Sequence, residues 1–459
     1  MTNEVFDVVV VGGGVVGCAV ARELSAYQLS VALIEVKGDV GDGTSKANTA
    51  ILHTGFDASP GTLESRLVPR GYELLTRYAA STGIPVEGTG AVLVAWSDDE
   101  LDALPRLRDK AAKNGYQQCE LITADAVYAR VPTLGAGALG GMTVPDESII
   151  CPWTTTLALA TDAMTRGASI LLRHGLLGVA VGKSVTTLST SQGEVRCRWV
   201  VNAAGLGSDT IDRLFGNDRF TVVPRRGELL VFDKFARQLV DTIVLPVPTS
   251  KGKGVLVSPT IYGNVMLGPT SEDRADRGDT STSEEGFAFL LEKGSRLMPA
   301  LLDEEVTASY AGLRAATEHS DYVVDLDSAQ RYLVLGGIRS TGLTASMALA
   351  EHAAQLLQDA GVVMPARIEL PEAPRMPSIG EQMTRPFASD QAIDQDSDYG
   401  RVVCFCERVT RGEIRDALAG PLPPCDLDGL RRRTRATMGR CQGFYCGAEV
   451  DALLSGAAQ

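Results

Sequence analysis

The glycines at positions 12, 14 and 17 have the spacing of a dinucleotide-binding turn. Gly12-x-Gly14-x-x-Gly17 follows four consecutive valines and precedes an apolar segment typical of a helix. Glycine at these positions permits a tight turn, lets the backbone approach a pyrophosphate, and lets strand and helix pack closely. Glu35 ends the next apolar run at the spacing expected of a carboxylate that binds a ribose hydroxyl. These residues predict a dinucleotide site.

Val15 and Val16 stand between the glycines, at the start of the expected helix. The first turn of a helix has free N–H groups and partial positive charge, which suit an anionic phosphate. We therefore include both valines in the cofactor site. A strand, a glycine turn, a helix, a second strand and an acidic residue together favour dinucleotide binding over a purely structural turn.

Two later segments favour FAD over NAD. Residues 200–205 end a strand with small side chains, which places Ala204 and Gly205 beside the cofactor. Residues 331–338 form another expected strand, and a glycine-rich turn then opens a long helix. The N-terminus of such a helix stabilises the negative charge of a reduced flavin. The cofactor residues expected in this turn are Gly337, Gly342, Leu343 and Thr344.

Five of the nine cysteines lie between positions 404 and 446. Such clustering in a reduced compartment favours a metal or iron–sulfur site over disulfides. Cys404-x-Cys406 and Cys441-x4-Cys446 supply four thiolates in two pairs, which suit a [2Fe–2S] cluster and equally a structural zinc ion. Cys425 lies between the pairs in a proline-rich loop and is not expected to be a ligand.

Alternating helical and strand patterns predict an α/β fold that holds these residues. The Rossmann-like FAD-binding domain is expected to be discontinuous, with an inserted α+β substrate domain and a small C-terminal Cys-rich module. Prolines and acidic residues mark an extended linker before the module. The expected division is 1–80, 146–218 and 316–362 for the FAD-binding domain, 81–145 and 219–315 for the substrate domain, 363–400 for the linker and 401–459 for the [2Fe–2S] module.

The composition limits the partners. The 459 residues carry a formal net charge of −14, with a pI near 4.9, which disfavours nucleic acid because phosphate binding needs a basic face. A small anionic substrate, bound in a local basic pocket, is compatible with this composition. We expect no transmembrane segment, because the apolar start of the chain is too short and too rich in glycine. A cytoplasmic protein is expected, with peripheral contact to the inner face of the membrane as an alternative.

Taken together, these motifs resemble the D-amino-acid-oxidase superfamily of flavoproteins, and more narrowly its glycerol-3-phosphate dehydrogenase and L-2-hydroxyglutarate dehydrogenase relatives. The Cys-rich motif resembles the bacterioferritin-associated-ferredoxin-like [2Fe–2S] domain. The resemblance adds Ser45, Asn48 and Thr49 to the expected cofactor site. The matching segments are 12–17, 45–55, 202–205, 263–270, 312–314 and 337–344, together with Glu35.

The same resemblance implies roles in the substrate pocket. His53 would accept the hydroxyl proton as hydride leaves for flavin N5; the alternatives are a residue that positions the flavin and a structural histidine. Arg314 would clamp a carboxylate or phosphate, with a surface salt bridge as the alternative. Arg339 is a second candidate of this kind. Four further basic residues belong either to the pocket or to the solvated surface: Arg225, Arg226, Lys251 and Lys253.

An arginine run precedes the second cysteine pair, at positions 431–433, 435 and 440. We interpret it as a device that offsets the negative charge of the cluster or docks an acidic electron-transfer partner.

The sequence therefore predicts an FAD-dependent dehydrogenase that oxidises a small anionic secondary alcohol, with glycerol 3-phosphate as first choice. Electrons would leave through the cluster to a quinone or a partner subunit, in a homo- or hetero-oligomer. The alternatives are a 2-hydroxy acid dehydrogenase or oxidase, an amine or imino-acid dehydrogenase, and a non-catalytic electron-transfer or scaffold subunit.

Overall fold

The computed structural model describes residues 4–248 and 254–457. Its first sheet has eight strands, of which five are parallel neighbours in the order β9-β2-β1-β12-β20, and β10, β11 and β19 join the sheet antiparallel. The strands are β1 (Val5–Val11), β2 (Val31–Glu35), β9 (Ser169–Leu172), β10 (Leu176–Val181), β11 (Thr186–Thr190), β12 (Gly193–Asn202), β19 (Val323–Asp327) and β20 (Tyr332–Gly336). The expected α/β class and the valine strand are confirmed.

Helices cover this sheet and bury its apolar side chains. Helix α1 (Val15–Leu24) packs against α5 (Pro152–Thr165) and α8 (Gly342–Asp359), and α2 (Leu63–Thr82) packs on α8. Helix α6 (Ser208–Leu214) lies beside β20 and β12. The apolar residues of β1 and β2 are almost fully buried because their two faces contribute to two separate core clusters. A rigid sheet thus fixes the turn after β1 and the N-terminus of α8.

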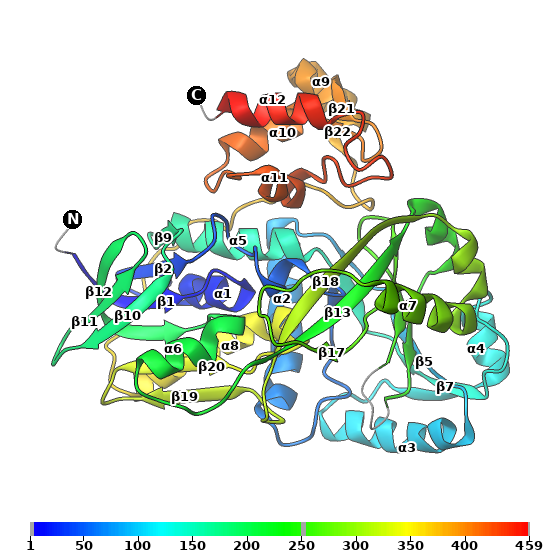
Figure 1. Cartoon of the computed structure of the whole chain (residues 1–459), viewed down its shortest axis with the longest axis horizontal. Coiled ribbons are helices and arrows are strands. Elements are labelled where there is room, and N and C mark those ends of the chain that lie inside the picture. The colour runs from blue at the N-terminus through cyan, green and yellow to red at the C-terminus, as the bar shows by residue number, and fades with distance from the viewer. Residues whose placement is uncertain (1–3, 249–253, 458–459) are drawn as a thin grey trace.

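A second sheet of nine mostly antiparallel strands stands beside the first (Figure 1). Its longest contact joins β13 to β18 over ten residue pairs. The strands are β5 (Ala91–Ala95), β6 (Glu120–Thr123), β7 (Gly140–Val144), β13 (Val223–Phe232), β14 (Ile243–Pro246), β15 (Leu256–Pro259), β16 (Val265–Gly268), β17 (Glu272–Asp273) and β18 (Val306–Ala316). Three helices accompany it: α3 (Asp98–Lys113), α4 (Ala124–Arg130) and α7 (Glu284–Leu297).

A small sheet connects the two parts of the molecule. Its three strands are β3 (Ile51–Leu52), β8 (Ser148–Ile150) and β4 (Val86–Glu87), with β8 in the centre. Both pairings are antiparallel, and Ile51 faces Ile149 while Leu52 faces Ser148. This register is important for the site because it places His53, which follows β3, opposite Glu147, which precedes β8.

The C-terminal module lies on one side of the molecule, above α5 and β2 in Figure 1. It contains the hairpin β21 (Val402–Cys404) and β22 (Val409–Thr410), with helices α10 (Arg411–Ala419), α11 (Leu427–Thr434) and α12 (Gly447–Ala457). The preceding proline-rich segment is mostly irregular with one short helix, α9 (Asp390–Gln395). Its backbone bonds along the first part of the chain, for example from Met376 N–H to the Thr82 carbonyl. Within the described residues, no helix is long and apolar enough to cross a membrane.

Candidate functional site

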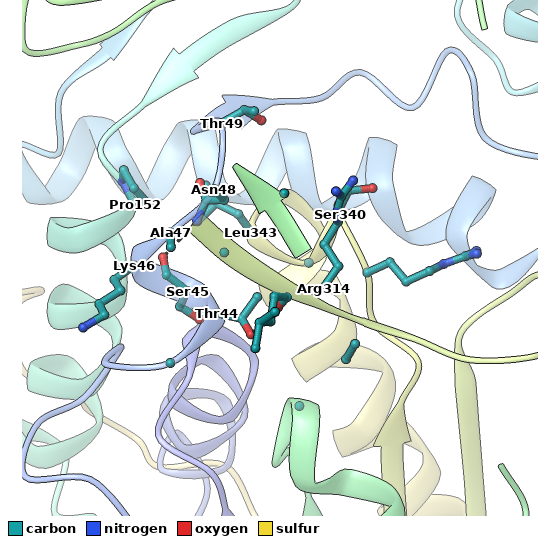
Figure 2. Close-up of a pocket in the computed structure, with 18 of the residues that line it drawn as sticks. Thr44, Ser45, Lys46, Ala47, Asn48, Thr49, Pro152, Arg314, Ser340 and Leu343 are labelled. Atoms are coloured by element: carbon teal, nitrogen blue, oxygen red, sulfur yellow. Dashed lines mark hydrogen bonds between the residues drawn. The ribbon is translucent and has the colours of Figure 1, made fainter. Parts of the chain in front are cut away.

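A large cavity of about 2150 Å³ lies between the two main sheets and extends to the C-terminal module. Figure 2 shows the loop Thr44–Thr49 along one part of its wall, with Arg314, Ser340 and Leu343 nearby. Most of the cofactor residues expected from the sequence line it. Those on the wall are Gly12, Gly14, Val15, Val16, Glu35, Ser45, Asn48, Thr49, Ala204, Gly205, Gly342 and Leu343.

The glycine turn after β1 has no room for side chains. Gly12 has φ +110°, and a Cβ there would lie 2.6 Å from the Ala203 carbonyl oxygen. A Cβ on Gly17 would lie 1.8 Å from the Gly12 carbonyl oxygen. Gly17 itself does not line the cavity; its role is to let α1 approach β1. The turn therefore leaves bare backbone at the cavity wall, as a pyrophosphate requires.

The N-terminus of α1 is open to an anion. Its N-cap is Gly14, which offers no side-chain cap, and its first turn holds no acidic residue. Glu35 accepts hydrogen bonds from the backbone N–H groups of Gly13 and Lys37, which orients the carboxylate at the end of β2. Burial raises the pKa of Glu35, and the two backbone N–H groups oppose that rise. The geometry fits a ribose and a pyrophosphate side by side.

The loop 44–49 is tied into the wall by hydrogen bonds on both sides. Ser45 Oγ accepts from the N–H of Val15 at 2.9 Å, and the hydroxyl of Thr44 donates to the Leu313 carbonyl at 2.8 Å. The buried Tyr310 hydroxyl donates to the Asn48 carbonyl at 2.8 Å. These bonds hold the loop between α1 and β18, and no local sequence pattern identifies Tyr310 as a partner of this loop.

Helix α8 brings its N-terminus to the cavity, as expected. Gly342 and Leu343 line the wall. Gly337, at φ +62°, and Thr344 do not line it. The Thr344 hydroxyl instead accepts from the backbone N–H of His53 at 3.0 Å, so it positions the histidine segment from behind.

His53 lines the cavity and is paired with a buried carboxylate. Its Nδ1 lies 2.9 Å from Oε2 of Glu147. The other carboxylate oxygen accepts from the backbone N–H and the hydroxyl of Thr54, at 2.7 and 2.9 Å. Glu147 is fully buried, so its orientation is fixed. With Nδ1 engaged, Nε2 is the nitrogen available to a bound molecule.

Arg314 lies half-buried on β18 and lines the cavity. Its guanidinium donates to the carbonyl oxygens of Thr270, at 2.8 Å, and Arg225, at 3.4 Å. Among the described residues, no carboxylate lies within ion-pair distance of it. Burial lowers the pKa of Arg314 to about 10, assisted by the nearby Arg225, so the group stays cationic at neutral pH. The nearby Asp273 carboxylate opposes this lowering of the pKa but pairs with Arg225, so the Arg314 guanidinium has no carboxylate partner of its own and suits an anionic ligand.

The other predicted basic residues differ in their environments. Arg339 lines the cavity and donates to the Ser320 carbonyl. Arg225 also lines the cavity but already pairs with Asp273 at 2.6 Å. Arg226 is buried in ion pairs with Glu228 and Glu272 and does not line the cavity. Lys251 and Lys253 lie outside the described residues.

The four cysteines of the module come together as two pairs. Burial raises the pKa of Cys406, and the neighbouring Cys441 and Cys404 thiols contribute to that pKa. Burial, together with the Cys404 thiol, raises the pKa of Cys446 to about 12. In the part of the chain that is described, no three His, Cys, Asp or Glu side chains converge on one point as a single metal ion needs. Four thiols close to one another fit a [2Fe–2S] cluster, in which each of two irons is held by two sulfurs, and a structural zinc ion held by the same thiolates is the alternative.

For Arg432 and Arg433, the structure contradicts the expected docking of an acidic partner. Arg432 and Arg433 are buried and both bind Asp39 of the first part of the chain, at 2.8 and 2.7 Å. Arg432 also binds Asp42 at 2.9 Å. Breaking a buried pair of this kind typically costs about 3–5 kcal/mol. These arginines therefore fix the module against its own chain rather than facing a partner, which sequence position alone did not reveal.

Comparisons with known proteins agree with this geometry. Residues 7–356 match the family model described as FAD dependent oxidoreductase, and residues 402–455 match the BFD-like [2Fe-2S] binding domain. Over 98% of its length, the chain is 33% identical to a glycerol 3-phosphate dehydrogenase of Caloramator mitchellensis, 94% of which it covers. Over 58% of its length, it is 30% identical to the mitochondrial L-2-hydroxyglutarate dehydrogenase of Homo sapiens, covering 61% of that protein.

A solved structure is also similar to most of the chain. The dithionite-reduced L-α-glycerophosphate oxidase of Mycoplasma pneumoniae with FAD bound has a TM-score of 0.77 and 27% sequence identity. The match covers 82% of this chain and all of that one.

Proposed function

Because the chain belongs to the FAD dependent oxidoreductase family and carries a BFD-like [2Fe-2S] binding domain, we propose that it is a dehydrogenase that oxidises glycerol 3-phosphate at its secondary alcohol. The observation that carries the substrate class is the unpaired guanidinium of Arg314 on the cavity wall. A phosphate dianion would supply the missing negative charge and accept two parallel N–H bonds. Resemblance to a full-length glycerol 3-phosphate dehydrogenase supports the same choice.

The proposed chemistry divides between the wall residues. When bound, FAD supplies the hydride acceptor. Arg314 holds the substrate phosphate, with Arg339 as a second cation at the edge of the cavity. His53 takes the hydroxyl proton at Nε2, and Glu147 fixes the ring and stabilises the imidazolium that results. Gly12, Gly14 and Glu35 hold the pyrophosphate and ribose of the cofactor.

The electron acceptor and the setting are part of the proposal. A [2Fe–2S] cluster held by Cys404, Cys406, Cys441 and Cys446 gives electrons a one-electron outlet, either to a quinone or to a partner subunit. We place the protein in the cytoplasm, where clustered cysteines stay reduced. We also keep the division into an FAD-binding domain, an inserted substrate domain and a C-terminal module, with the boundaries given above.

Arg314→Ala is expected to lower kcat/KM for glycerol 3-phosphate by about a hundredfold or more, mainly through KM. Charge-assisted hydrogen bonds contribute about 1.5–3 kcal/mol each, and two of them are lost. Lysine should rescue poorly because it lacks the planar fork. The measurement is the anaerobic rate of flavin bleaching against substrate concentration, with FAD content as a check.

Arg225→Ala is the matched control. Arg225 faces Arg314 across the β13–β18 pair but is already neutralised by Asp273, so its loss should change KM much less. An unchanged KM in Arg314→Ala would assign that arginine to the structure of the wall. Bleaching by L-2-hydroxyglutarate or by a secondary amine, without bleaching by glycerol 3-phosphate, would replace the proposed substrate.

The flavin is expected to be bound without a covalent link. No cysteine is found among the described residues that line the cavity, and His53 Nδ1 is engaged by Glu147. Acid precipitation should therefore release all of the yellow colour into the supernatant. Colour that stays with the pellet after denaturation and washing would contradict this expectation.

A further inference from the structure

Arg435 has a backbone conformation that arginine rarely adopts. It ends α11 at φ +69°, in the left-handed region, where glycine is the usual residue because a side chain costs about 1–2 kcal/mol. Its side chain is nevertheless buried and crosses from the module to the rest of the chain. An arginine that occupies a glycine position while fully enclosed indicates that its guanidinium has a specific task.

The guanidinium of Arg435 lies over an aromatic pair. Its central carbon is 4.3 Å from the ring centroid of Tyr262 and 6.0 Å from that of Trp153. The two rings stack with centroids 4.8 Å apart at 17°. Trp153 Nε1 donates to the carbonyl of Lys46 at 3.0 Å, and Lys46 belongs to the loop along the cavity wall (Figure 2). Trp153, Tyr262 and Arg435 all line the cavity themselves, so this stacked group lies on the cavity wall at the boundary with the module.

On its other side, Arg435 reaches the four-cysteine site. Its Nε donates to Oε2 of Glu407 at 2.7 Å, and Glu407 directly follows Cys406. The turn that carries the second cysteine pair is packed closely against this point, since a Cβ on Gly439 would lie 2.3 Å from Cys406 Cβ. A continuous series of bonded and packed groups therefore runs from Cys406 through Arg435 to the wall of the cavity.

Arg435 also donates to Asn264 Oδ1 across this boundary at 3.2 Å, and further ion pairs elsewhere dock the module as well. Arg432 and Arg433 bind Asp39 on one flank. On another flank, Arg440 binds Asp233 at 2.9 Å. Several ion pairs thus hold the module in place without the aromatic contact, and the stacked rings call for a different explanation.

We propose that Trp153, Tyr262 and Arg435 form the route by which electrons pass from the flavin cavity to the four-cysteine site. Electron transfer between separated centres is faster through packed and bonded groups than across water-filled gaps. Arg435 adds a buried positive charge between two centres that each become more negative on reduction. The inference rests on the proposed function, which supplies the electrons.

The number of electrons released by the substrate determines how often the route is used in each turnover. Oxidation of one secondary alcohol to a ketone releases two electrons and two protons, and both electrons reach FAD as hydride. A [2Fe–2S] cluster accepts one electron at a time, with one Fe(III) becoming Fe(II). Two successive one-electron transfers, each followed by delivery to an external one-electron acceptor, together with release of the one proton gained as hydride, would return bound FAD to its oxidised form, while the hydroxyl proton goes to His53. The route is therefore used twice for each substrate.

Tyr262→Leu in the full chain with both cofactors tests the route. Rapid mixing with glycerol 3-phosphate under anaerobic conditions follows two events: loss of the flavin band, and appearance of the reduced cluster by freeze-quench EPR. We expect flavin bleaching at the native rate and cluster reduction slowed by about tenfold or more, because the ring stack is removed. Tyr262→Phe is the matched control, since it keeps the stack and loses only the hydroxyl contact to Cys151; it should reduce the cluster at the native rate.

Four outcomes would overturn the proposal, the last of them from proteolysis. One is native cluster reduction in Tyr262→Leu. Another is equal slowing in Tyr262→Phe, which assigns the effect to the Cys151 contact. The third is equal slowing of flavin bleaching and cluster reduction in Tyr262→Leu, which assigns Tyr262 to the substrate reaction. Proteolysis of the segment 363–400 at the native rate shows that the module stays docked, and faster cleavage would assign the effect to undocking instead.

A second way of supplying electrons separates this inference from the proposed function. Flash reduction of the flavin by a photogenerated donor needs no substrate, and the electron can then be followed to the cluster in the same variants. If glycerol 3-phosphate bleaches nothing, the proposed substrate fails while the route is still tested by the flash. If the flash shows native transfer in Tyr262→Leu, the route fails whatever the substrate is.

Discussion

His53→Asn is expected to slow reduction of the flavin by glycerol 3-phosphate by about 10²- to 10⁴-fold, the usual range for loss of a general base. Asparagine keeps a polar side chain on the wall but cannot take up a proton at neutral pH. KM should change much less than the rate of bleaching, because Arg314 still holds the substrate phosphate. Single-turnover bleaching at saturating substrate measures the effect, and FAD content shows that the cavity is intact.

Glu147→Gln tests the same pair from the other side. The amide is nearly isosteric and can still accept from Thr54, but its NH₂ group would donate to His53 Nδ1. The ring proton would then sit on Nε2, the nitrogen that has to accept the substrate proton. We therefore expect a loss close to that of His53→Asn, with an unchanged melting temperature. Full activity in Glu147→Gln, or in His53→Asn, would move the histidine to a role in positioning the flavin.

Glu147 shows why local patterns cannot identify the whole site. It stands in a short acidic turn before β8, and nothing near it in the sequence marks it as catalytic. It meets His53 because β3 and β8 pair antiparallel, with Leu52 facing Ser148, so the next position along the pair brings His53 to Glu147. Strand register depends on contacts between distant segments, and a single sequence does not encode it in any local spacing.

The glycine turn, in contrast to Glu147, could be recognised from a local sequence pattern. Gly12, Gly14 and Gly17 lie within six residues, and a side chain at Gly12 or Gly17 would collide with neighbouring backbone atoms. The acidic residue that ends β2, Glu35, follows one strand, one helix and a second strand along the chain. Most of the expected cofactor residues line the cavity for this reason, whereas Gly17, Gly337 and Thr344 do not. Family membership confirms the FAD prediction and the [2Fe–2S] prediction.

The C-terminal module contains both kinds of feature: some could be predicted from a local sequence pattern, and others depend on contacts with distant residues. Its cysteine spacing predicted a metal site of four thiolates, and the resemblance to a [2Fe–2S] domain, which the family match supports, favoured the cluster over zinc. Its position was not predictable, because it depends on Asp39 and Asp233, charged residues that look like solvated surface in the sequence. The arginines that hold these carboxylates resembled a surface for a partner in the sequence until their ion pairs with the first part of the chain were seen. A run of charged residues in a sequence shows only which charges are present. The function of each residue depends on whether its side chain is buried and on the partner that it binds.

Cys441→Ser is expected to abolish the visible iron–sulfur absorption and the EPR signal, because a serine hydroxyl ionises far less readily than a thiol and thiolates are the ligands of such clusters. Bleaching of the flavin by glycerol 3-phosphate should persist, since Arg314, His53 and Glu147 lie in the other part of the chain. Turnover with a one-electron dye should slow, because the flavin loses its outlet.

Cys425→Ser is the matched control for this variant. Cys425 is an exposed thiol of the same module that lies outside the two cysteine pairs, so its replacement should leave iron, sulfide and turnover at native values. Iron and acid-labile sulfide are measured in protein purified without air. Zinc without iron in the native protein would make the module structural, and dye turnover would then be the same in Cys441→Ser, Cys425→Ser and the native chain.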